Sequence, residues 1–413
     1  MNGLGRPCML LTGESKRNPV IDGVEVEECF DKDGEQIVPL VSSTIEMVNL
    51  SSYYQVAVID EIQMLQDARR GQGWTSALLG LKAMEIHLCG EETAVPLVKR
   101  IFESCGEEVT VIKYERLSGL EVSDSSLNGT LEGIRDGDCI VAFSRKRIFE
   151  LQRQIQSVTR RKCALIYGSL PPENRALQAQ LFNDPNSEYK VLVASDAIGM
   201  GLNLKIQRVI FENVTKYDGI VTRHLSISQL KQIGGRAGRF SFASGDSVGQ
   251  VTSLYSKDLS SVKKFMFATP EPIPKAGFFP STDVSEAFFY EFPEKSTLEL
   301  LDMIYDTTIV PDDYFIADIS TMKKLAVLFS GIDLPLAQYL ARNKPCPISD
   351  VFDIPRNPPK SKEHLAMYES LHKSVLLYLW LGYHFPTIYV DLEDAQKYKL
   401  EVEQLIQKGF LKR

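Results

Sequence analysis

Short apolar runs alternate with stretches of helical spacing through the first two thirds of the chain. The apolar runs predict strands at residues 56–59, 85–89, 109–113, 139–143, 164–167, 190–194 and 208–212. Apolar residues recur at helical spacing at residues 73–84, 146–157 and 175–182. Strands that are apolar on both faces and alternate with helices indicate doubly wound parallel sheets. The pattern therefore predicts an α/β fold.

The alternating series occurs twice, and a different pattern follows it. The two series predict two α/β domains with a link near residues 116–124. Prolines then punctuate the chain at Pro270, Pro272, Pro274 and Pro280. Beyond them, helical spacing appears at residues 297–306, 322–329, 363–381 and 397–410. We therefore predict three domains: residues 1–117 and 118–268 as α/β lobes, and residues 269–413 as a helical domain.

Composition narrows the class of protein. The 413 residues are 44% hydrophobic and 24% charged, as in globular proteins. No apolar run reaches the roughly 18–20 residues of a membrane helix, so we expect no membrane partner. The seven cysteines are scattered without a C-x-x-C pair, which argues against zinc and disulfides. A net charge of −8 disfavours non-specific attraction to nucleic acid, but a local groove can still be basic.

Two carboxylates directly follow the predicted strand at residues 56–59. Asp60 and Glu61 would lie at the carboxyl edge of a parallel sheet, where α/β folds bind ligands. In nucleotide hydrolases with this arrangement, the first acid holds Mg²⁺ and the second positions the attacking water. Asp60 would be the metal-side acid and Glu61 the water-side acid. The pair alone leaves open the alternative of a solvated strand end.

Two glycine-containing motifs follow later in the chain. Residues 191–203 form a strand pattern that ends at Ser195 and continues into a turn with Gly199 and Gly201. Residues 232–239 read Q-I-G-G-R-A-G-R, in which glycines allow close approach to two arginines. Arginine binds phosphate oxygens through two parallel hydrogen bonds. The alternatives are an ordinary glycine turn and a basic surface helix, but the order of the three motifs favours a nucleotide-driven motor.

The amino-acid sequences of these motifs resemble those of a known family. The order of the motifs is similar to that of superfamily-two helicases, whose two RecA-like lobes enclose ATP. The finer resemblance is to the suppressor-of-Var family of mitochondrial ATP-dependent RNA helicases of the RNA degradosome. It is carried by V-I-D-E-I-Q-M (58–64), G-L-K-A-M-E-I-H-L-C-G-E (80–91), G-D-C-I-V-A-F-S (137–144), I-Y-G-S-L-P-P (166–172), F-N-D-P-N (182–186), S-D-A-I-G-M-G-L-N-L (195–204) and G-R-A-G-R-F (235–240).

The resemblance implies a role for particular residues. The catalytic set would be Asp60, Glu61, Gln63, Arg236 and Arg239, with Asp60 on the metal, Gln63 as a coupling residue and the arginines as fingers. Residues 87–91 would link hydrolysis to unwinding. Nucleotide contacts would come from Gly201, Gln232, Arg236 and Arg239. RNA contacts would come from Thr12, Gly13, Thr44, Glu46, Ser144 and Ser195. The alternative for the hydroxyl residues is that they are ordinary loop residues.

The resemblance also implies fold, cofactors and partners. The fold would be two RecA-like parallel-sheet lobes followed by a mainly helical C-terminal domain. ATP and Mg²⁺ would drive 3′-to-5′ unwinding of RNA in the mitochondrial matrix, for RNA degradation and surveillance with an exoribonuclease of the degradosome.

The chain departs from the helicase pattern in two ways. Ser195 and Asn203 replace the Thr and Asp of many helicases, with similar hydrogen-bonding capacity. No G-x-x-x-x-G-K-[ST] motif occurs in the chain. The first lobe is therefore expected to be incomplete and the chain N-terminally truncated, without a targeting segment. On this expectation the chain alone is inactive, and the rival reading is a non-catalytic RNA- or nuclease-binding fragment.

Overall fold

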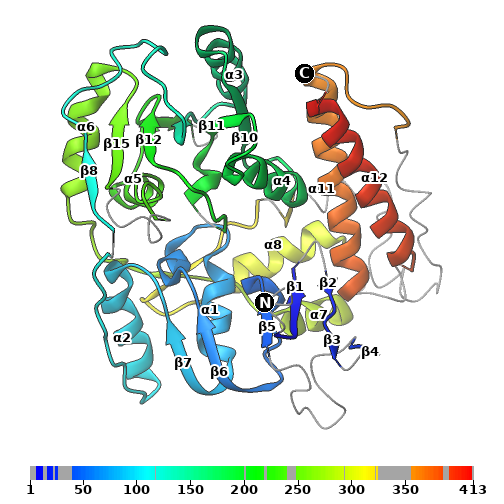
Figure 1. The fold of residues 1–413 in the computed structure, drawn as a ribbon. Helices are drawn as coiled ribbons and strands as arrows, with labels where there is room; N and C mark the ends of the chain where they lie inside the picture. The colour runs from blue at the N-terminus through cyan, green and yellow to red at the C-terminus, as the bar shows by residue number, and fades with distance from the viewer. Residues whose placement is uncertain are drawn as a thin grey trace. The chain divides into compact units, whose positions relative to one another are not determined.

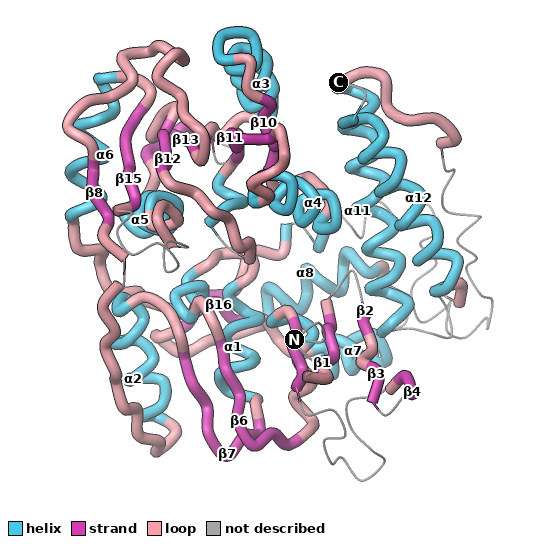
Figure 2. The backbone as a smooth tube through the Cα atoms, in the orientation of Figure 1, coloured by secondary structure: helices cyan, strands magenta, loops and turns pink. Residues whose placement is uncertain are grey.

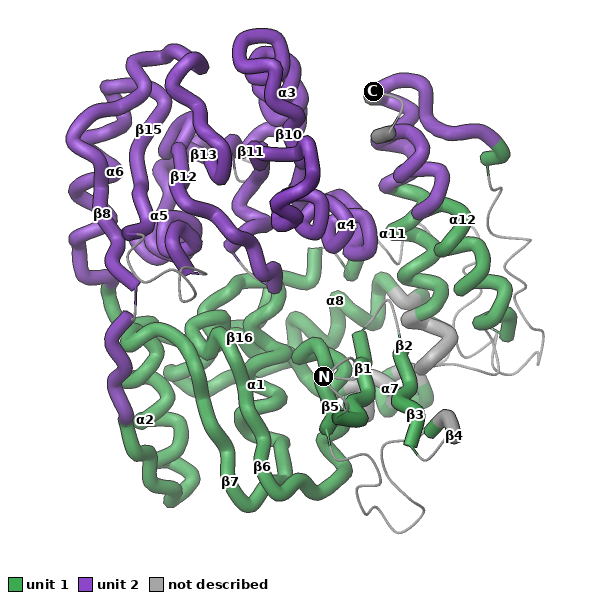
Figure 3. Tube along the Cα trace, viewed as in Figure 1, with its two compact units in different colours: residues 1–111, 271–356, 370–402 green, residues 112–270, 357–369, 403–413 purple. Residues whose placement is uncertain are grey.

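The chain forms two compact units. The computed structural model describes residues 6–12, 16–21, 24–26, 40–116, 118–199, 201–217, 221–239, 248–292, 294–320, 322–323, 355–384 and 390–411 (Figure 1). Unit 1 comprises residues 1–111, 271–356 and 370–402, and unit 2 comprises residues 112–270, 357–369 and 403–413 (Figure 3). Each unit therefore combines an N-terminal or central segment with parts of the C-terminal region.

A parallel sheet of six strands forms the centre of unit 2 (Figure 2). In spatial order the strands are β10 (Lys162–Ile166), β11 (Tyr189–Ala194), β9 (Asp138–Val141), β12 (Arg208–Phe211), β15 (Gly249–Ser253) and β8 (Leu120–Val122). Every residue of β9 and β12 is buried, because these central strands are covered on both faces. The predicted parallel α/β fold is confirmed here, and β8 and β15 are strands that the apolar pattern did not reveal.

Four helices pack around this sheet. They are α3 (Arg145–Thr159), α4 (Pro172–Asn183), α5 (Ile227–Gly234) and α6 (Ser256–Phe267). Helix α5 begins with a capping box, in which Ser226 and Gln229 satisfy each other's backbone N–H groups. Helices α3 and α4 contact β10, whereas α6 contacts β15 and α5. The hairpin of β13 (Thr215–Tyr217) and β14 (Thr222–His224) lies between β12 and α5 in the chain.

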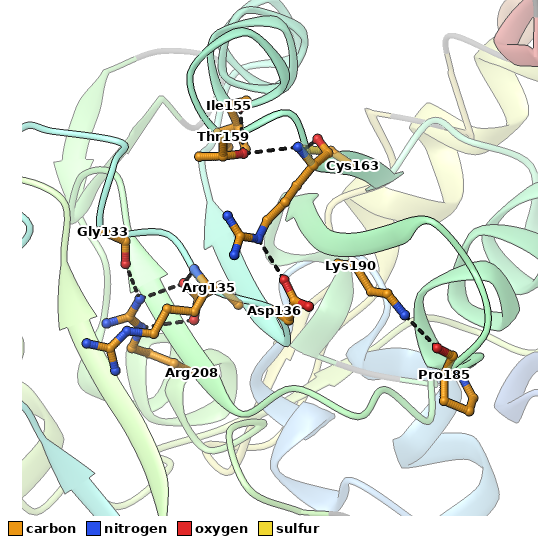
Figure 4. A network of polar contacts seen from close by, with 11 residues as sticks. Gly133, Arg135, Asp136, Ile155, Thr159, Cys163, Pro185, Lys190 and Arg208 are labelled. Atoms are coloured by element: carbon orange, nitrogen blue, oxygen red, sulfur yellow. Dashed lines mark hydrogen bonds and ion pairs between the residues drawn. The ribbon is translucent and has the colours of Figure 1, made fainter.

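A buried ion pair joins two central strands at their amino ends. Arg208, the first residue of β12, donates from Nε and Nη2 to the carboxylate of Asp138 at 2.9 and 2.6 Å. Nη2 also donates to the carbonyl of Gly133 at 2.8 Å (Figure 4). A two-pronged Arg–carboxylate contact fixes register as well as charge. It therefore holds β9 and β12 together at the sheet edge opposite to the predicted site.

The α/β segment of unit 1 contains shorter sheets. Strand β6 (Tyr53–Ile59) pairs in parallel with β7 (Lys82–Leu88), and β1 (Cys8–Leu11) pairs in parallel with β5 (Leu40–Ser43). Strand β2 (Lys16–Arg17) adds to β1, and β3 (Val20–Ile21) pairs with β4 (Val24–Glu25). Helices α1 (Gly71–Gly80) and α2 (Val95–Ser104) contribute to a core that includes Leu65 and Leu97. Val56 and Val58 on β6 are 54% and 64% exposed, so this sheet is less covered than that of unit 2.

One predicted element of this segment is too long, and another does not form. The helix predicted at residues 73–84 ends at Gly80, since Leu81 is extended and Lys82 starts β7. The strand predicted at residues 109–113 does not form, and residues 107–116 have no regular structure. Val111 and Ile112 are exposed, and no described strand lies beside them to complete a ladder.

The C-terminal region is mainly helical, as predicted. Its described helices are α7 (Thr282–Glu291), α8 (Thr297–Thr307), α11 (Lys362–His384) and α12 (Leu392–Leu411). Strands β16 (Ala276–Phe278) and β17 (Tyr314–Ile316) pair in parallel, and β16 packs against α1 in unit 1. The helix predicted at residues 322–329 falls almost wholly outside the described residues. Among the helices described, none has the length and apolarity needed to cross a membrane.

Candidate functional site

The acidic pair forms a tight turn at the carboxyl end of β6. Asp60 is exposed, and its Oδ1 accepts a hydrogen bond from the Glu61 amide at 2.9 Å. Glu61 adopts the left-handed conformation, with φ 55° and ψ 46°. An uncommon backbone conformation of this kind costs free energy unless its surroundings fix it. Here the amide of Ile62 donates to the carbonyl of Cys89 at 2.9 Å, which ties the turn to the end of β7.

Gln63 connects the acidic pair to the segment after β7. Its Nε2 donates to Glu61 Oε2, and its Oε1 accepts from the Glu91 amide at 3.1 Å. The side chain is only 5% exposed. A Cβ at Gly90 would lie 2.3 Å from Gln63 Oε1, so this approach requires glycine. The structure thus brings together the acidic pair and residues 87–91, which the resemblance assigns to coupling.

Three of the residues expected to contact RNA from the first lobe are described, and they lie at one sheet edge. Thr12 follows β1, and the amide of Thr44 donates to the carbonyl of Leu11 at 2.9 Å. Thr12 and Thr44 therefore adjoin at the carboxyl ends of two paired parallel strands. Glu46 lies on the short helix η2 (Ile45–Met47). Gly13 lies outside the described residues.

Glu46 is also linked to the acidic pair by a chain of contacts. Its carboxylate pairs with Arg70 at 2.9 Å, and the Arg70 guanidinium lies 5.2 Å from the centroid of the Trp74 ring. Trp74 Nε1 then donates to the carbonyl of Asp60 at 2.8 Å. Trp74 is 6% exposed and belongs to the core of this segment. The chain of contacts offers a physical route between the predicted RNA edge and the acids.

The two serines of unit 2 follow neighbouring strands of the sheet. Ser144 follows β9 and caps α3, accepting from the Arg147 amide at 3.4 Å. Ser195 follows β11, and its Oγ accepts from the Ala197 amide at 3.1 Å at the start of η5 (Asp196–Gly199). Ser144 is exposed, whereas Ser195 is buried. Both hydroxyls therefore have a local structural role. Exposed Ser144 could contact a phosphate without rearrangement, whereas buried Ser195 could not.

The two arginines of the 232–239 motif have different surroundings. Arg236 is 8% exposed and donates to the carbonyls of Gly199 and, at 3.2 Å, Leu202. It thereby joins the arginine turn to the glycine turn that contains Gly201, whose φ is 69°. Arg239 is exposed, and no hydrogen bond joins it to another described residue. Arg239 is therefore the one placed to reach an external anion.

Gln232 completes this cluster on α5. Its side chain faces Gly199, where an added Cβ would lie 3.5 Å from Gln232 Cδ and Oε1. The structure therefore gathers Gly201, Gln232, Arg236 and Arg239 around two adjoining turns at one end of the unit 2 sheet. Each of these residues was expected to contact nucleotide.

Two residues of unit 2 with polar contacts near these motifs were not found by sequence reasoning. Arg116 donates to the carbonyls of Gly235, at 2.9 Å, and Ala237. Its pKa is lowered, first by burial and then by the charge of Arg239. Glu369 on α11 is 4% exposed and accepts from Arg145, the residue after Ser144, at 2.9 Å. No sequence pattern marks either residue, because their partners are more than 100 positions away in the chain.

The acidic pair suits a magnesium ion carried by a nucleotide. Mg²⁺ takes oxygen ligands and is commonly held by one or two carboxylates together with phosphate oxygens and water. Asp60 presents an exposed carboxylate of this kind. Within the described ranges no cluster of three or more His, Cys, Asp or Glu residues could hold a metal alone. The donor set therefore fits a metal that arrives with phosphate.

Comparisons with known proteins agree with the motifs. Residues 1–114 match the family model "DEXQ-box helicase domain of Suv3", in which D-E-x-Q corresponds to Asp60, Glu61 and Gln63. Residues 124–241 match "Helicase conserved C-terminal domain", and residues 365–412 match "ATP-dependent RNA helicase SUV3 C-terminal domain".

Relatives match along almost the whole chain. The mitochondrial ATP-dependent RNA helicase SUPV3L1 of Mus musculus is 38% identical over 99% of this chain and 55% of its own length. SUV3 of Saccharomyces cerevisiae is 38% identical over 97% of this chain and 57% of its own length. The chain thus spans little more than half of these two relatives. SUV3 of Oryza sativa subsp. japonica is 38% identical, with 98% of this chain and 72% of the relative covered. The chain belongs to the SUV3 family of ATP-dependent RNA helicases.

Proposed function

We propose that the chain is the motor part of an RNA helicase that couples ATP hydrolysis to RNA unwinding. The observation that carries the proposal is the geometry of the D-E-x-Q box. Asp60 and Glu61 end a parallel strand, and Gln63 connects Glu61 to residues 87–91. In a member of the SUV3 family, this arrangement supports hydrolysis at the acids with a direct link to the segment assigned to coupling.

The acids and the exposed arginine have complementary roles in this proposal. Asp60 holds the magnesium ion of Mg-ATP, and Glu61 orients the attacking water and accepts its proton. Arg239 stabilises negative charge on the transferred phosphoryl group. Arg236 holds the turn through Gly199 and Leu202, and Gly201 and Gln232 line the nucleotide beside it.

RNA is proposed to contact both lobes through its phosphate backbone. Thr12, Gly13 and Thr44 supply the phosphate contacts of the first lobe, and Glu46 contacts RNA away from the phosphates, which its carboxylate would repel. In the second lobe, exposed Ser144 contacts phosphate directly, and buried Ser195 does so after a rearrangement that exposes it. Contacts from hydroxyl and backbone groups to phosphate carry no sequence information, so we expect little sequence preference. The proposed lobes are residues 1–117 and 118–268, with residues 269–413 closing the RNA path.

The proposed setting follows from the family. The named relatives are mitochondrial RNA helicases. We place this protein in the mitochondrial matrix, where it moves 3′-to-5′ on RNA and delivers unwound strands to an exoribonuclease of the degradosome. Its role there is RNA degradation and surveillance.

A second candidate is a non-catalytic module that binds RNA or a nuclease. It is favoured by the sequence, which contains no G-x-x-x-x-G-K-[ST] motif to hold the triphosphate. The two candidates differ in one measurable property, because only the helicase turns over ATP.

ATP hydrolysis separates the candidates when it is measured, with and without single-stranded RNA, on protein extended at its N-terminus by a segment that supplies the missing G-x-x-x-x-G-K-[ST] motif. The helicase reading expects turnover that RNA stimulates, and its loss in Glu61→Gln with binding of a fluorescent ATP analogue retained. Glu103→Gln, an exposed carboxylate on α2, is the matched control and should behave as the unaltered protein. Binding of RNA without any binding or turnover of ATP would establish the second candidate instead. Normal turnover in Glu61→Gln would show that the water-side acid is misassigned.

A further inference from the structure

Arg116 donates hydrogen bonds to the turn that directly precedes Arg239. The first segment of unit 1 ends at Val111, and Arg116 lies in the short segment that leads from there into the unit 2 sheet. Its Nη1 donates to the carbonyl of Gly235 at 2.9 Å, and its Nη2 donates to the carbonyl of Ala237. Its Nε donates to the carbonyl of Ser118 at 2.9 Å. Three sides of one planar guanidinium are thus fixed on backbone carbonyls.

Other contacts also restrain this turn, which is formed by residues 235–238. Gly238 has φ 74°, and an added Cβ would lie 2.7 Å from the backbone of Gly249. Its amide donates to the carbonyl of Ile206 at 2.8 Å. Arg236 anchors the same turn to Gly199. The contacts of Arg116 on either side of Arg236 therefore complete a turn whose next residue, Arg239, projects into solvent.

Arg116 also acts on Arg239 through charge. The two guanidiniums are close enough for the charge of Arg239 to lower the pKa of Arg116. Arg116 is exposed, and its hydrogen bonds to the carbonyls hold its guanidinium in place. The repulsion therefore disfavours conformations in which Arg239 folds back onto the turn, and it leaves Arg239 available to an anion.

We propose that Arg116 is a positioning residue for Arg239: its guanidinium fixes the arginine turn and ties it to the segment that joins the two units. The catalytic part of this inference rests on the proposed function, in which Arg239 stabilises the transferred phosphoryl group. The structural part stands without it. A change in the joining segment would shift the turn, and a misplacement on the order of 1 Å can reduce a rate by about a hundredfold.

Two variants separate the contribution of the planar Arg116 guanidinium from that of its positive charge. Arg116→Ala removes both, whereas Arg116→Lys keeps the charge but loses the planar fork. Arg153→Ala is the matched control, because Arg153 is an exposed arginine of α3 in the same unit. Amide hydrogen exchange of residues 233–239 is measured on the full chain, with β11 as an internal reference. ATP turnover with RNA is measured in parallel on the N-terminally extended protein, because this sequence contains no G-x-x-x-x-G-K-[ST] motif.

Exchange in the turn should rise about tenfold or more in both variants, with β11 and Arg153→Ala unchanged, since charged hydrogen bonds are lost. The kcat for ATP should fall by about tenfold to a hundredfold, with KM within about twofold. Unchanged exchange of the turn in Arg116→Lys would overturn the proposal, whatever happens to turnover. Altered exchange in both variants, together with no ATP turnover in the extended protein without these substitutions, would uphold the positioning and refute the proposed helicase function alone.

Discussion

Removal of the Glu369 carboxylate should selectively destabilise unit 2. Glu369 belongs to the C-terminal segment 357–369 of this unit and is 4% exposed. Its Oε1 accepts from Arg145 Nη2 at 2.9 Å and Tyr167 Oη at 2.8 Å, and its Oε2 accepts from Ser169 Oγ at 2.8 Å. Burial, and next the charge of Glu369, raise the pKa of Tyr167, so this phenol remains a donor.

The magnitude follows from what Glu369→Ala leaves behind. Removing one partner of a buried ion pair costs about 3–5 kcal/mol, because the other charge remains unpaired. The Arg145 side chain is 28% exposed, so water compensates in part and we expect the lower end, about 3 kcal/mol. Glu369→Gln keeps an acceptor for Arg145 and Tyr167, and the Ser169 hydroxyl can turn to accept from the new amide. We therefore expect about 1 kcal/mol for this variant.

Hydrogen exchange of the unit 2 sheet measures these losses without assuming that both units unfold together. A loss of about 3 kcal/mol should accelerate the slowest amides of β10 and β11 by about a hundredfold. Glu369→Gln should accelerate them by less than about tenfold, and Glu132→Ala, an exposed carboxylate of the same unit, should leave them unchanged. Exchange in Glu369→Ala equal to that of Glu132→Ala would refute the reasoning, since the segment 357–369 would then not be held by this carboxylate.

Three further predictions concern reactivity, exposure and pH. Burial raises the pKa of Cys163 to about 12, so this thiol should resist iodoacetamide at pH 8 while exposed Cys89 and Cys105 react. Peptide mass spectrometry measures the labelling, and rapid labelling of Cys163 would contradict its burial. Amides of β6 should exchange much faster than those of β11, because β6 pairs with β7 alone among the described strands; equal protection would show that β6 is covered on both edges. Hydrogen bonds from Ser296 lower the pKa of Glu299. The cap of α8 should therefore be fully formed at pH values above the ordinary carboxyl pKa and weaken as the pH falls through the lowered pKa. NMR chemical shifts of α8 that do not change over that pH range would refute this.

The sequence predicted the strands whose burial makes them uniformly apolar. Strands β9 to β12 are covered on both faces, and their apolar runs matched the structure to within two residues. Strand β15 reads G-Q-V-T-S and β8 has three residues, so neither contains a long apolar run. Residues 109–113 read V-T-V-I-K and are rich in β-branched residues, as strands are, but no described strand lies beside them. Strand propensity depends on neighbours that local sequence does not specify.

The site divides in the same way. The acidic pair, Gln63 and the arginines occur in contiguous motifs, and the structure brings each group together as the motifs indicate. Arg116 and Glu369 act through partners that lie 119 and 224 positions away along the chain. Their contacts depend on the fold, and no local spacing encodes them. Likewise, Arg236 differs from Arg239 because it donates to the carbonyls of Gly199 and Leu202, which their own motif does not contain.

The central claim is tested most directly by displacement of a short RNA strand from a duplex with a single-stranded 3′ tail, measured with the N-terminally extended protein. We expect ATP-dependent displacement from the 3′-tailed duplex and little from a 5′-tailed one. Arg239→Ala should reduce the rate by about 10³-fold or more, and Arg239→Lys should restore little, because a point charge cannot reproduce the two-pronged contact. Displacement that proceeds without ATP, or at the normal rate in Arg239→Lys, would contradict the account.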